Sequence, residues 1–258
     1  MNRPNEGWEG WDSYAAFYDW ENAQTVQRRD VAFWQRLAAA AEGDVLELGC
    51  GTGRVSLPVA KHGTPLIGID RSAPMLARAR RRVVRAGLEA RVRLVRGDIR
   101  VLPFRPRRFS LVMAPYGILQ SLVRERDLAA TLESAARVLR KGGRLGIDLV
   151  PDLPVWSEYE GKKTLSGHMG RDTHVSLVES VRQDRAKKLT IFDQRYTTVR
   201  GSERRLHCFS LTFRTLTVPQ MARRLERAGF VVDAVLGDYR GGPWDARADV
   251  WVLLARKR

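Results

Sequence analysis

The chain has 258 residues, 44% of them hydrophobic, which is enough to bury one substantial core. No stretch approaches about 18 consecutive apolar residues, and no basic segment followed by an apolar one opens the sequence, so we expect neither a membrane span nor an export signal. Its two cysteines, Cys50 and Cys208, suggest neither a disulfide framework nor a cysteine-based metal site. These features favour a soluble protein of the reducing cytoplasm.

The formal net charge of +16 has two interpretations. A positive field attracts nucleic acid, anionic membranes or acidic substrates. However, arginine outnumbers lysine and is scattered over every segment, as a generally arginine-rich composition would produce. We favour the compositional origin and keep a nucleic-acid partner as the alternative.

Residues 1–40 are too aromatic for a disordered tail, and we expect them to fold back as a cover. The aromatic side chains concerned are Trp8, Trp11, Tyr14, Phe17, Tyr18, Trp20, Phe33 and Trp34.

Residues 41–150 alternate short apolar runs with longer helical patterns, which is typical of parallel strands joined by crossover helices. Ser72 is a suitable cap for the helix that follows the second strand, and the helix before the fifth strand is predicted to run to Gly142 and Gly143. The pattern therefore predicts a doubly wound sheet. Its strands are expected at residues 44–49, 65–70, 91–98, 109–115 and 144–150.

The pattern changes between residues 151 and 217, where residues 174–183, 187–200 and 204–216 resemble antiparallel strands with polar turns. We interpret this segment as an insertion on the substrate side. Residues 218–258 are predicted to complete the core with a helix that ends at Gly229 and a pair of strands.

The stretch "VLELGCGTGR" carries the clearest functional signal. Gly49, Gly51 and Gly53 stand at alternate positions, so neither the dinucleotide fingerprint G-x-G-x-x-G nor a P-loop is present. A glycine turn between a strand and a helix lets a ligand approach the backbone closely. Glu47 lies in the strand before the turn, and Asp70 and Asp98 end the next two strands.

In this order, "LELGCGTG" and the acidic residues at 70 and 98 resemble the motifs of class I S-adenosylmethionine-dependent methyltransferases. The resemblance covers about residues 40–150, and the final helix and strand pair also fit. It implies an α/β fold, a Rossmann-like seven-stranded sheet with helices on both faces and an antiparallel β insertion after strand five. It also implies S-adenosylmethionine as cofactor and S-adenosylhomocysteine as product.

The resemblance assigns roles along the cofactor. Asp70 would take the ribose hydroxyls, because a carboxylate offers two acceptor oxygens. Asp98 and Ile99 would receive the adenine, and Glu47 with the glycine backbone would lie under the methionine and ribose. Met75 would either cover the adenine or belong to the core. The expected cofactor-binding residues are Glu47, Gly49, Cys50, Gly51, Thr52, Gly53, Asp70, Arg71, Met75, Asp98, Ile99 and Ala114.

The acceptor is expected to be a small molecule. After the fourth strand, in "MAPYGILQSL", Ala114 replaces the Asn or Asp that base-modifying amino methyltransferases carry. The spacing of Tyr14, Tyr18 and Asp19, and the inserted sheet, resemble glycine N-methyltransferase and the amino-sugar N,N-dimethyltransferases. The resemblance implies methylation at nitrogen, with oxygen as an alternative. An RNA methyltransferase and a non-catalytic binding protein remain competing hypotheses, and a homodimer is possible.

Methyl transfer from a sulfonium is a direct displacement, so alignment of the nucleophile matters more than proton removal. A neutral amine needs no strong base, whereas an alcohol or phenol does. The candidate catalytic residues are Tyr14, Tyr18, Tyr116 and His168, and His174 and His207 are further possible bases.

Arg28 and Arg29 are candidates for binding the carboxylate of the cofactor. No cluster has convincing metal-ligand spacing, and we predict no metal.

Overall fold

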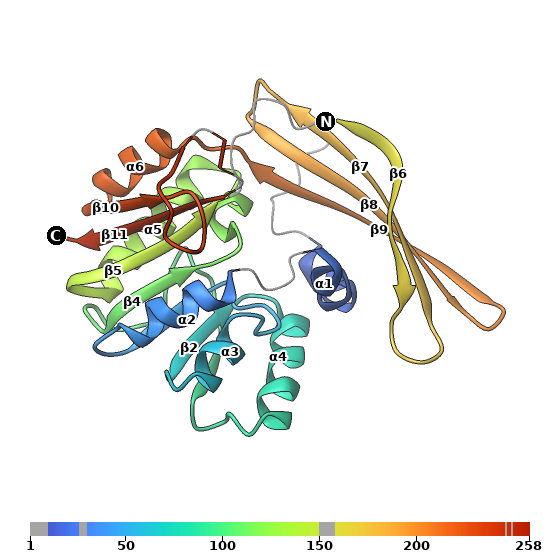
Figure 1. Cartoon of the computed structure of the whole chain (residues 1–258), viewed down its shortest axis with the longest axis horizontal. Coiled ribbons are helices and arrows are strands. Elements are labelled where there is room, and N and C mark those ends of the chain that lie inside the picture. Colours follow the sequence, from blue (N-terminus) through green and yellow to red (C-terminus); the bar gives the residue numbers. More distant parts are fainter. Residues whose placement is uncertain (1–9, 26–29, 150–157, 246, 249) are drawn as a thin grey trace. The chain divides into compact units, whose positions relative to one another are not determined.

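The computed structural model describes residues 10–25, 30–149, 158–245, 247–248 and 250–258. The chain divides into two compact units. The larger comprises Arg28–Gln120, Arg124–Asp152 and Leu216–Arg258, and the smaller comprises Met1–Gln27, Ser121–Val123 and Leu153–Thr215. Each unit is described by itself (Figure 1).

The larger unit is built on a seven-stranded sheet with the strand order β10-β11-β5-β4-β1-β2-β3. The five strands from β1 to β5 run parallel to one another, and β11 pairs antiparallel with β5 and β10. This confirms the predicted Rossmann-like sheet. The strands are β1 (Val45–Leu48), β2 (Leu66–Asp70), β3 (Val92–Arg96), β4 (Phe109–Ala114), β5 (Leu139–Leu149), β10 (Phe230–Leu236) and β11 (Trp251–Lys257).

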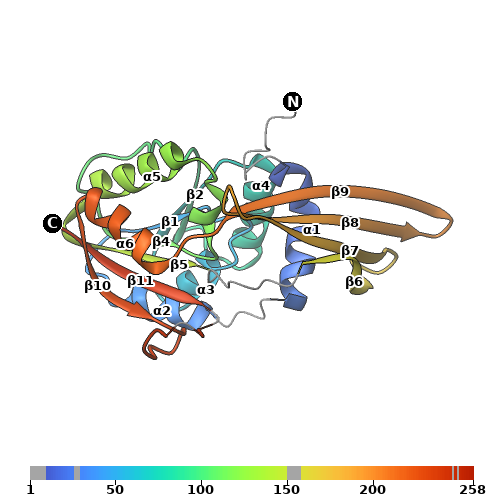
Figure 2. The ribbon, with the colours of Figure 1, turned by 90° about the horizontal axis from the view of Figure 1, so that it is seen from above.

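Helices cover both faces of this sheet. In Figure 2, α2 and α5 lie on opposite sides of it. The helices are α2 (Val31–Ala39), α3 (Ser56–Lys61), α4 (Ala73–Arg85), α5 (Glu125–Val138) and α6 (Val218–Arg227), with a 3-10 turn, η1 (Ile118–Ser121), after β4. All residues of β1 and β4 are buried, as expected for central strands covered on both faces. Trp34 of α2 is fully buried in this core.

Local capping explains where two of these helices begin. The Ser72 hydroxyl accepts a hydrogen bond from the backbone N–H of Met75 at 3.3 Å, which confirms the predicted cap of α4. Thr217 and Gln220 form a capping box at the start of α6. These caps satisfy N–H groups that the first helical turn leaves without a partner.

One boundary prediction is wrong. The helix before β5 does not reach Gly142 but ends at Val138, and Leu139 has the extended backbone of a strand. Leu139 is fully buried and pairs with Phe109 of β4, so tertiary packing overrides the helical pattern of the following basic residues.

The smaller unit contains the predicted antiparallel insertion as a four-stranded sheet, β6-β7-β8-β9. Its strands are β6 (Tyr159–His168), β7 (His174–Asp184), β8 (Leu189–Arg200) and β9 (Glu203–Arg214). The sequence analysis missed β6, because its residues "YEGKKTLSGH" are polar and include two glycines, and the strand is held by pairing with β7.

Helix α1 (Trp11–Thr25) also belongs to the smaller unit. Its aromatic side chains pack on the inserted sheet, where Phe17 stacks on the fully buried Tyr196 with ring centroids 4.4 Å apart. Glu21 accepts hydrogen bonds from the hydroxyls of Tyr14 and Tyr196, and Gln194 bridges Glu21 and Glu179. Burial raises the pKa of Glu21. The amino-terminal aromatic residues thus divide: those of α1 join the insertion, whereas Phe33 and Trp34 join the larger core.

Candidate active site

The glycine turn between β1 and α3 has the left-handed backbone that favours glycine. The φ angles are +61° at Gly49, +52° at Gly51 and +80° at Gly53. A β-carbon at Gly49 would lie 2.6 Å from Cγ1 of Ile118, and one at Gly53 would overlap Leu57. At Gly51 the nearest such neighbour is the Gly49 carbonyl oxygen, 4.0 Å away. The chain is therefore bare at Gly51, where a ligand can approach the backbone.

Asp70, at the carboxyl end of β2, is fixed beside this turn. One carboxylate oxygen accepts the backbone N–H of Gly51 at 2.8 Å, and the other accepts the N–H of Ser72, also at 2.8 Å. Asp70, at the end of the next strand along the chain, thus joins the glycine turn to the loop before α4. This geometry brings Gly51 and Asp70 together at the end of β2.

Glu47 lies beneath the turn and is 3% exposed. Burial raises its pKa to about 8, although the hydrogen bond from the Ser56 hydroxyl and the charge of Arg54 act in the opposite direction. Burial thus favours the protonated form of the Glu47 carboxyl.

Arg54 directly follows the turn and connects it to the loop after β4. Its guanidinium makes two hydrogen bonds of 2.7 Å to the buried carboxylate of Asp30, and its Cζ atom lies 4.8 Å from the ring centroid of Tyr116. Tyr116 has a φ of +60°, which is unusual for a side chain of this size, and it is 41% exposed. An exposed aromatic ring held on a strained backbone is typical of functional sites.

Asp148, near the end of β5, holds the same loop. Its carboxylate accepts the backbone N–H of Gly117 at 2.9 Å and the hydroxyl of Tyr239 at 2.8 Å. Burial raises the pKa of Asp148 to about 6, with a further contribution from the charge of Asp30.

The raised pKa of Asp148 makes a testable prediction for Asp148→Asn. A carboxyl whose pKa is higher in the folded than in the unfolded state contributes stability at low pH that is lost as the pH rises through the folded-state value. We expect the free energy of unfolding of the native protein, relative to that of the variant, to fall by about 2–3 kcal/mol between pH 3 and pH 8. Urea unfolding across this pH range measures the difference, and a difference independent of pH would contradict the assignment.

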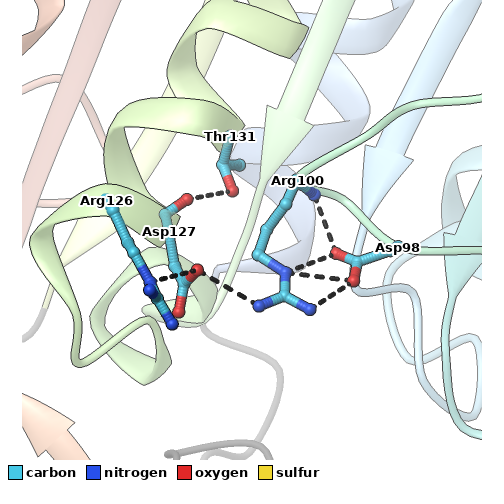
Figure 3. A network of polar contacts seen from close by, with 5 residues as sticks. All are labelled: Asp98, Arg100, Arg126, Asp127 and Thr131. Atoms are coloured by element: carbon cyan, nitrogen blue, oxygen red, sulfur yellow. Dashed lines mark hydrogen bonds and ion pairs between the residues drawn. The ribbon is translucent and has the colours of Figure 1, made fainter.

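The other predicted cofactor residues of this unit surround the same turn and strand ends. Met75 is 2% exposed at the start of α4, and the N–H of Cys50 donates to the Ile69 carbonyl oxygen at 3.0 Å. Burial raises the pKa of the Cys50 thiol. Thr52 and Ala114 are fully buried, Arg71 is exposed and Ile99 is half-buried. Asp98 is held by Arg100 (Figure 3).

Tyr14, Tyr18 and His168 lie in the smaller unit. Tyr14 is buried and its ring packs edge-on against that of Tyr18, with centroids 6.0 Å apart. His168 packs against His174 at 5.4 Å, and His207 contacts Phe17 at 5.0 Å. Arg28 and Arg29 fall outside the described residues.

Sequence analysis missed four residues of the candidate site, namely Asp30, Arg54, Asp148 and Tyr239. Asp148 had a detectable signal, because it is a carboxylate inside the apolar run "LGIDLV", as Glu47 is in "VLELG".

Within the described parts of the chain, no group of three or more His, Cys, Asp or Glu side chains could hold a metal ion. No helix among the described residues is long and apolar enough to cross a membrane.

Comparison with known proteins identifies the family. A family described as "Methyltransferase domain" matches residues 45–143. The chain is 30% identical over 196 residues to the 27-O-demethylrifamycin SV methyltransferase of Amycolatopsis mediterranei, a match that covers 68% of this chain and 70% of that protein. The chain belongs to the S-adenosylmethionine-dependent methyltransferases. The present chain is also 28% identical to the cypemycin N-terminal methyltransferase of a Streptomyces species, with 83% of each chain covered.

The phosphatidylethanolamine N-methyltransferase of Cereibacter sphaeroides is 44% identical over 108 residues, but this match spans only about half (51%) of that protein and 42% of this chain. Among solved structures, the CcbJ methyltransferase from Streptomyces caelestis has a TM-score of 0.78 at 22% identity and covers 95% of this chain and 96% of its own. At that identity the structural likeness supports the fold alone.

The residues at the carboxyl edge fit S-adenosylmethionine. The cofactor has no phosphate, and the turn offers no lysine of the P-loop kind. It has hydroxyl and amine donors, and the strand ends offer the carboxylates of Asp70 and Asp98. The backbone is bare at Gly51, next to Asp70.

Proposed function

We propose that this methyltransferase methylates an amine nitrogen of a small-molecule acceptor. The observation that carries the proposal is the acid–base composition around the glycine turn. Among the described residues of the larger unit, the ionisable side chains there include Glu47, Cys50, Arg54, Asp70, Arg82 and Tyr116, and that unit's one histidine, His62, caps the far end of α3. The chain's other three histidines belong to β6, β7 and β9 of the smaller unit. A neutral amine attacks through its own lone pair and needs no imidazole base.

The names of two relatives agree with a nitrogen acceptor. The phosphatidylethanolamine enzyme is named an N-methyltransferase, and the cypemycin enzyme is named an N-terminal methyltransferase. The rifamycin relative is named for an oxygen position, so methylation at oxygen is the alternative that an experiment must distinguish.

In this proposal, Asp70 accepts the ribose hydroxyls of the cofactor, and the backbone of Gly49, Gly51 and Gly53 lies against its methionine and ribose portions. Asp98 and Ile99 receive the adenine. The cofactor supplies a methyl group on a sulfonium, which is a good leaving group. Tyr116, exposed on the loop after β4, aligns the acceptor nitrogen for displacement.

Roles for Tyr14, Tyr18 and His168 of the smaller unit stay predictions, as do a homodimer and a cytoplasmic location.

The pH dependence of the reaction tests whether an amine is the nucleophile. A panel of amino sugars and N-terminal peptides with different amine pKa values would be supplied with methyl-labelled S-adenosylmethionine. Because only the neutral amine attacks, we expect the rising limb of kcat/KM against pH to move with the pKa of the acceptor amine. Matched hydroxyl analogues are the control. Methylation of the hydroxyl analogues, with a limb fixed by the enzyme, would contradict the proposal.

A further inference from the structure

Arg100 surrounds the Asp98 carboxylate with hydrogen-bond donors (Figure 3). Its backbone N–H donates to Oδ1 at 2.9 Å, its Nη2 donates to Oδ2 at 2.7 Å, and its Nε lies 3.0 Å from both oxygens. The two residues are separated by Ile99 alone, so the loop after β3 folds back on itself. Although partial burial acts to raise the pKa of Asp98, the Arg100 contacts outweigh it and lower that pKa, so the carboxylate stays ionised.

The same guanidinium is fixed at its other end. Nη1 of Arg100 donates to Oδ1 of Asp127 at 3.1 Å. Asp127 is 8% exposed and lies in the first turn of α5, where the carboxylate also complements the helix dipole. The Thr131 hydroxyl donates to the Asp127 carbonyl oxygen at 2.8 Å, and Nε of Arg126 lies 3.9 Å from the Asp127 carboxylate. Arg100 thus joins the loop after β3 to α5.

The geometry limits what Asp98 can recognise. A carboxylate has about four acceptor positions, and Arg100 supplies three N–H groups to them, one of which is shared between the oxygens. Capacity remains for about one more donor, and the Asp98 side chain is 35% exposed. An ionised carboxylate only accepts, so that position suits an N–H donor such as the exocyclic amine of adenine.

We propose that Arg100 is a positioning residue for cofactor recognition, which holds Asp98 in the one orientation that accepts the adenine amine. The proposal rests on the proposed role of Asp98 at the adenine. Arg100 does not touch the base itself but acts through Asp98, and Asp127 fixes Arg100 in turn. Lysine cannot replace it fully, because an ammonium group lacks the planar fork that contacts both oxygens and Asp127 together.

Two ligands separate this role from a merely structural one. Binding of S-adenosylhomocysteine and of its deamino analogue, which carries hydrogen in place of the adenine amine, would be measured by calorimetry. For the native protein we expect the amine to improve affinity by about 10- to 100-fold, as a hydrogen bond to a charged group provides. In Arg100→Ala this ratio should fall to about 3-fold or less, because Asp98 loses its orientation, while affinity for the deamino analogue changes little. Arg100→Lys should give an intermediate ratio.

Arg108→Ala is the matched control. The Arg108 guanidinium pairs with the carboxylate of Asp44 at 2.9 Å. Asp44 directly precedes β1 and Arg108 directly precedes β4, so the pair lies at the opposite ends of these strands from Asp70 and Asp98, and its loss should leave the affinity ratio of the two ligands unchanged. Thermal unfolding identifies any variant that fails to fold, and Arg100→Lys then provides the test. An unchanged ratio in folded Arg100 variants would overturn the positioning role. If the native protein binds both ligands equally, that result would instead contradict the assignment of Asp98 to the adenine. If the native protein binds neither ligand, that result would contradict the cofactor site on which the proposed function depends.

Discussion

Replacing Asp70 with alanine is expected to weaken the binding of S-adenosylhomocysteine by about 100-fold. Hydrogen bonds to charged groups contribute about 1.5–3 kcal/mol each, and the carboxylate is the proposed acceptor for the ribose hydroxyls. The substitution also removes the acceptor of the Gly51 and Ser72 N–H groups, so the glycine turn loses its fixed position beside β2. Calorimetric titration of the purified variant measures the effect.

Asp44→Ala is the matched control for this experiment. Asp44 is also a carboxylate next to a strand of the same sheet, but it precedes β1 and pairs with Arg108 at the edge away from the glycine turn. Its removal should leave affinity for S-adenosylhomocysteine within about 2-fold, because an exposed ion pair contributes little. Native-like affinity of a folded Asp70→Ala protein would show that the ribose is recognised elsewhere.

Gly49→Ala is expected to lower the free energy of unfolding by about 2–5 kcal/mol. The left-handed backbone costs an L-residue about 1–2 kcal/mol, and the new β-carbon, 2.6 Å from Ile118, adds an overpacking cost of about 1–3 kcal/mol. Relief of the clash would displace the turn or the loop after β4, so cofactor affinity should fall as well. Urea unfolding and calorimetry provide the two measurements.

Gly87→Ala separates the two contributions. Gly87 has a φ of +63°, almost equal to that of Gly49, but a β-carbon there meets nothing within 4 Å. This control should lose only the backbone contribution of about 1–2 kcal/mol and keep cofactor affinity. Equal losses of stability in the two variants would mean that the Ile118 side chain accommodates the new β-carbon of Gly49→Ala with no loss of free energy of unfolding.

The parallel core could be predicted from sequence because its signals are local. β1, β2 and β4 are short, mostly apolar runs, whereas β3, "VRLVR", alternates apolar residues with arginine. Asp70 ends β2 as predicted, but β3 ends at Arg96, so Asp98 follows it by two residues. Strand β6 and the end of α5 could not be predicted in this way. Both depend on pairing with a neighbouring strand: β6 pairs with β7, and the extended, fully buried Leu139 pairs with Phe109 of β4.

The partners of the site residues also escaped prediction. Asp30 and Arg54 are 24 residues apart in sequence, and Tyr239 reaches Asp148 across 91 residues. Such pairs depend on how the folded core places their side chains. The pattern showed which carboxylates lie at the edge of the sheet but not which cations and hydroxyls hold them.

Label transfer from methyl-labelled S-adenosylmethionine into a cell extract tests the central claim most directly. The products would be separated into small molecules, RNA and protein, with an RNase-treated control. The proposed function predicts label in the small-molecule fraction that survives RNase. Label confined to RNase-sensitive material would contradict it, and would mean that the net charge of +16 serves to bind nucleic acid.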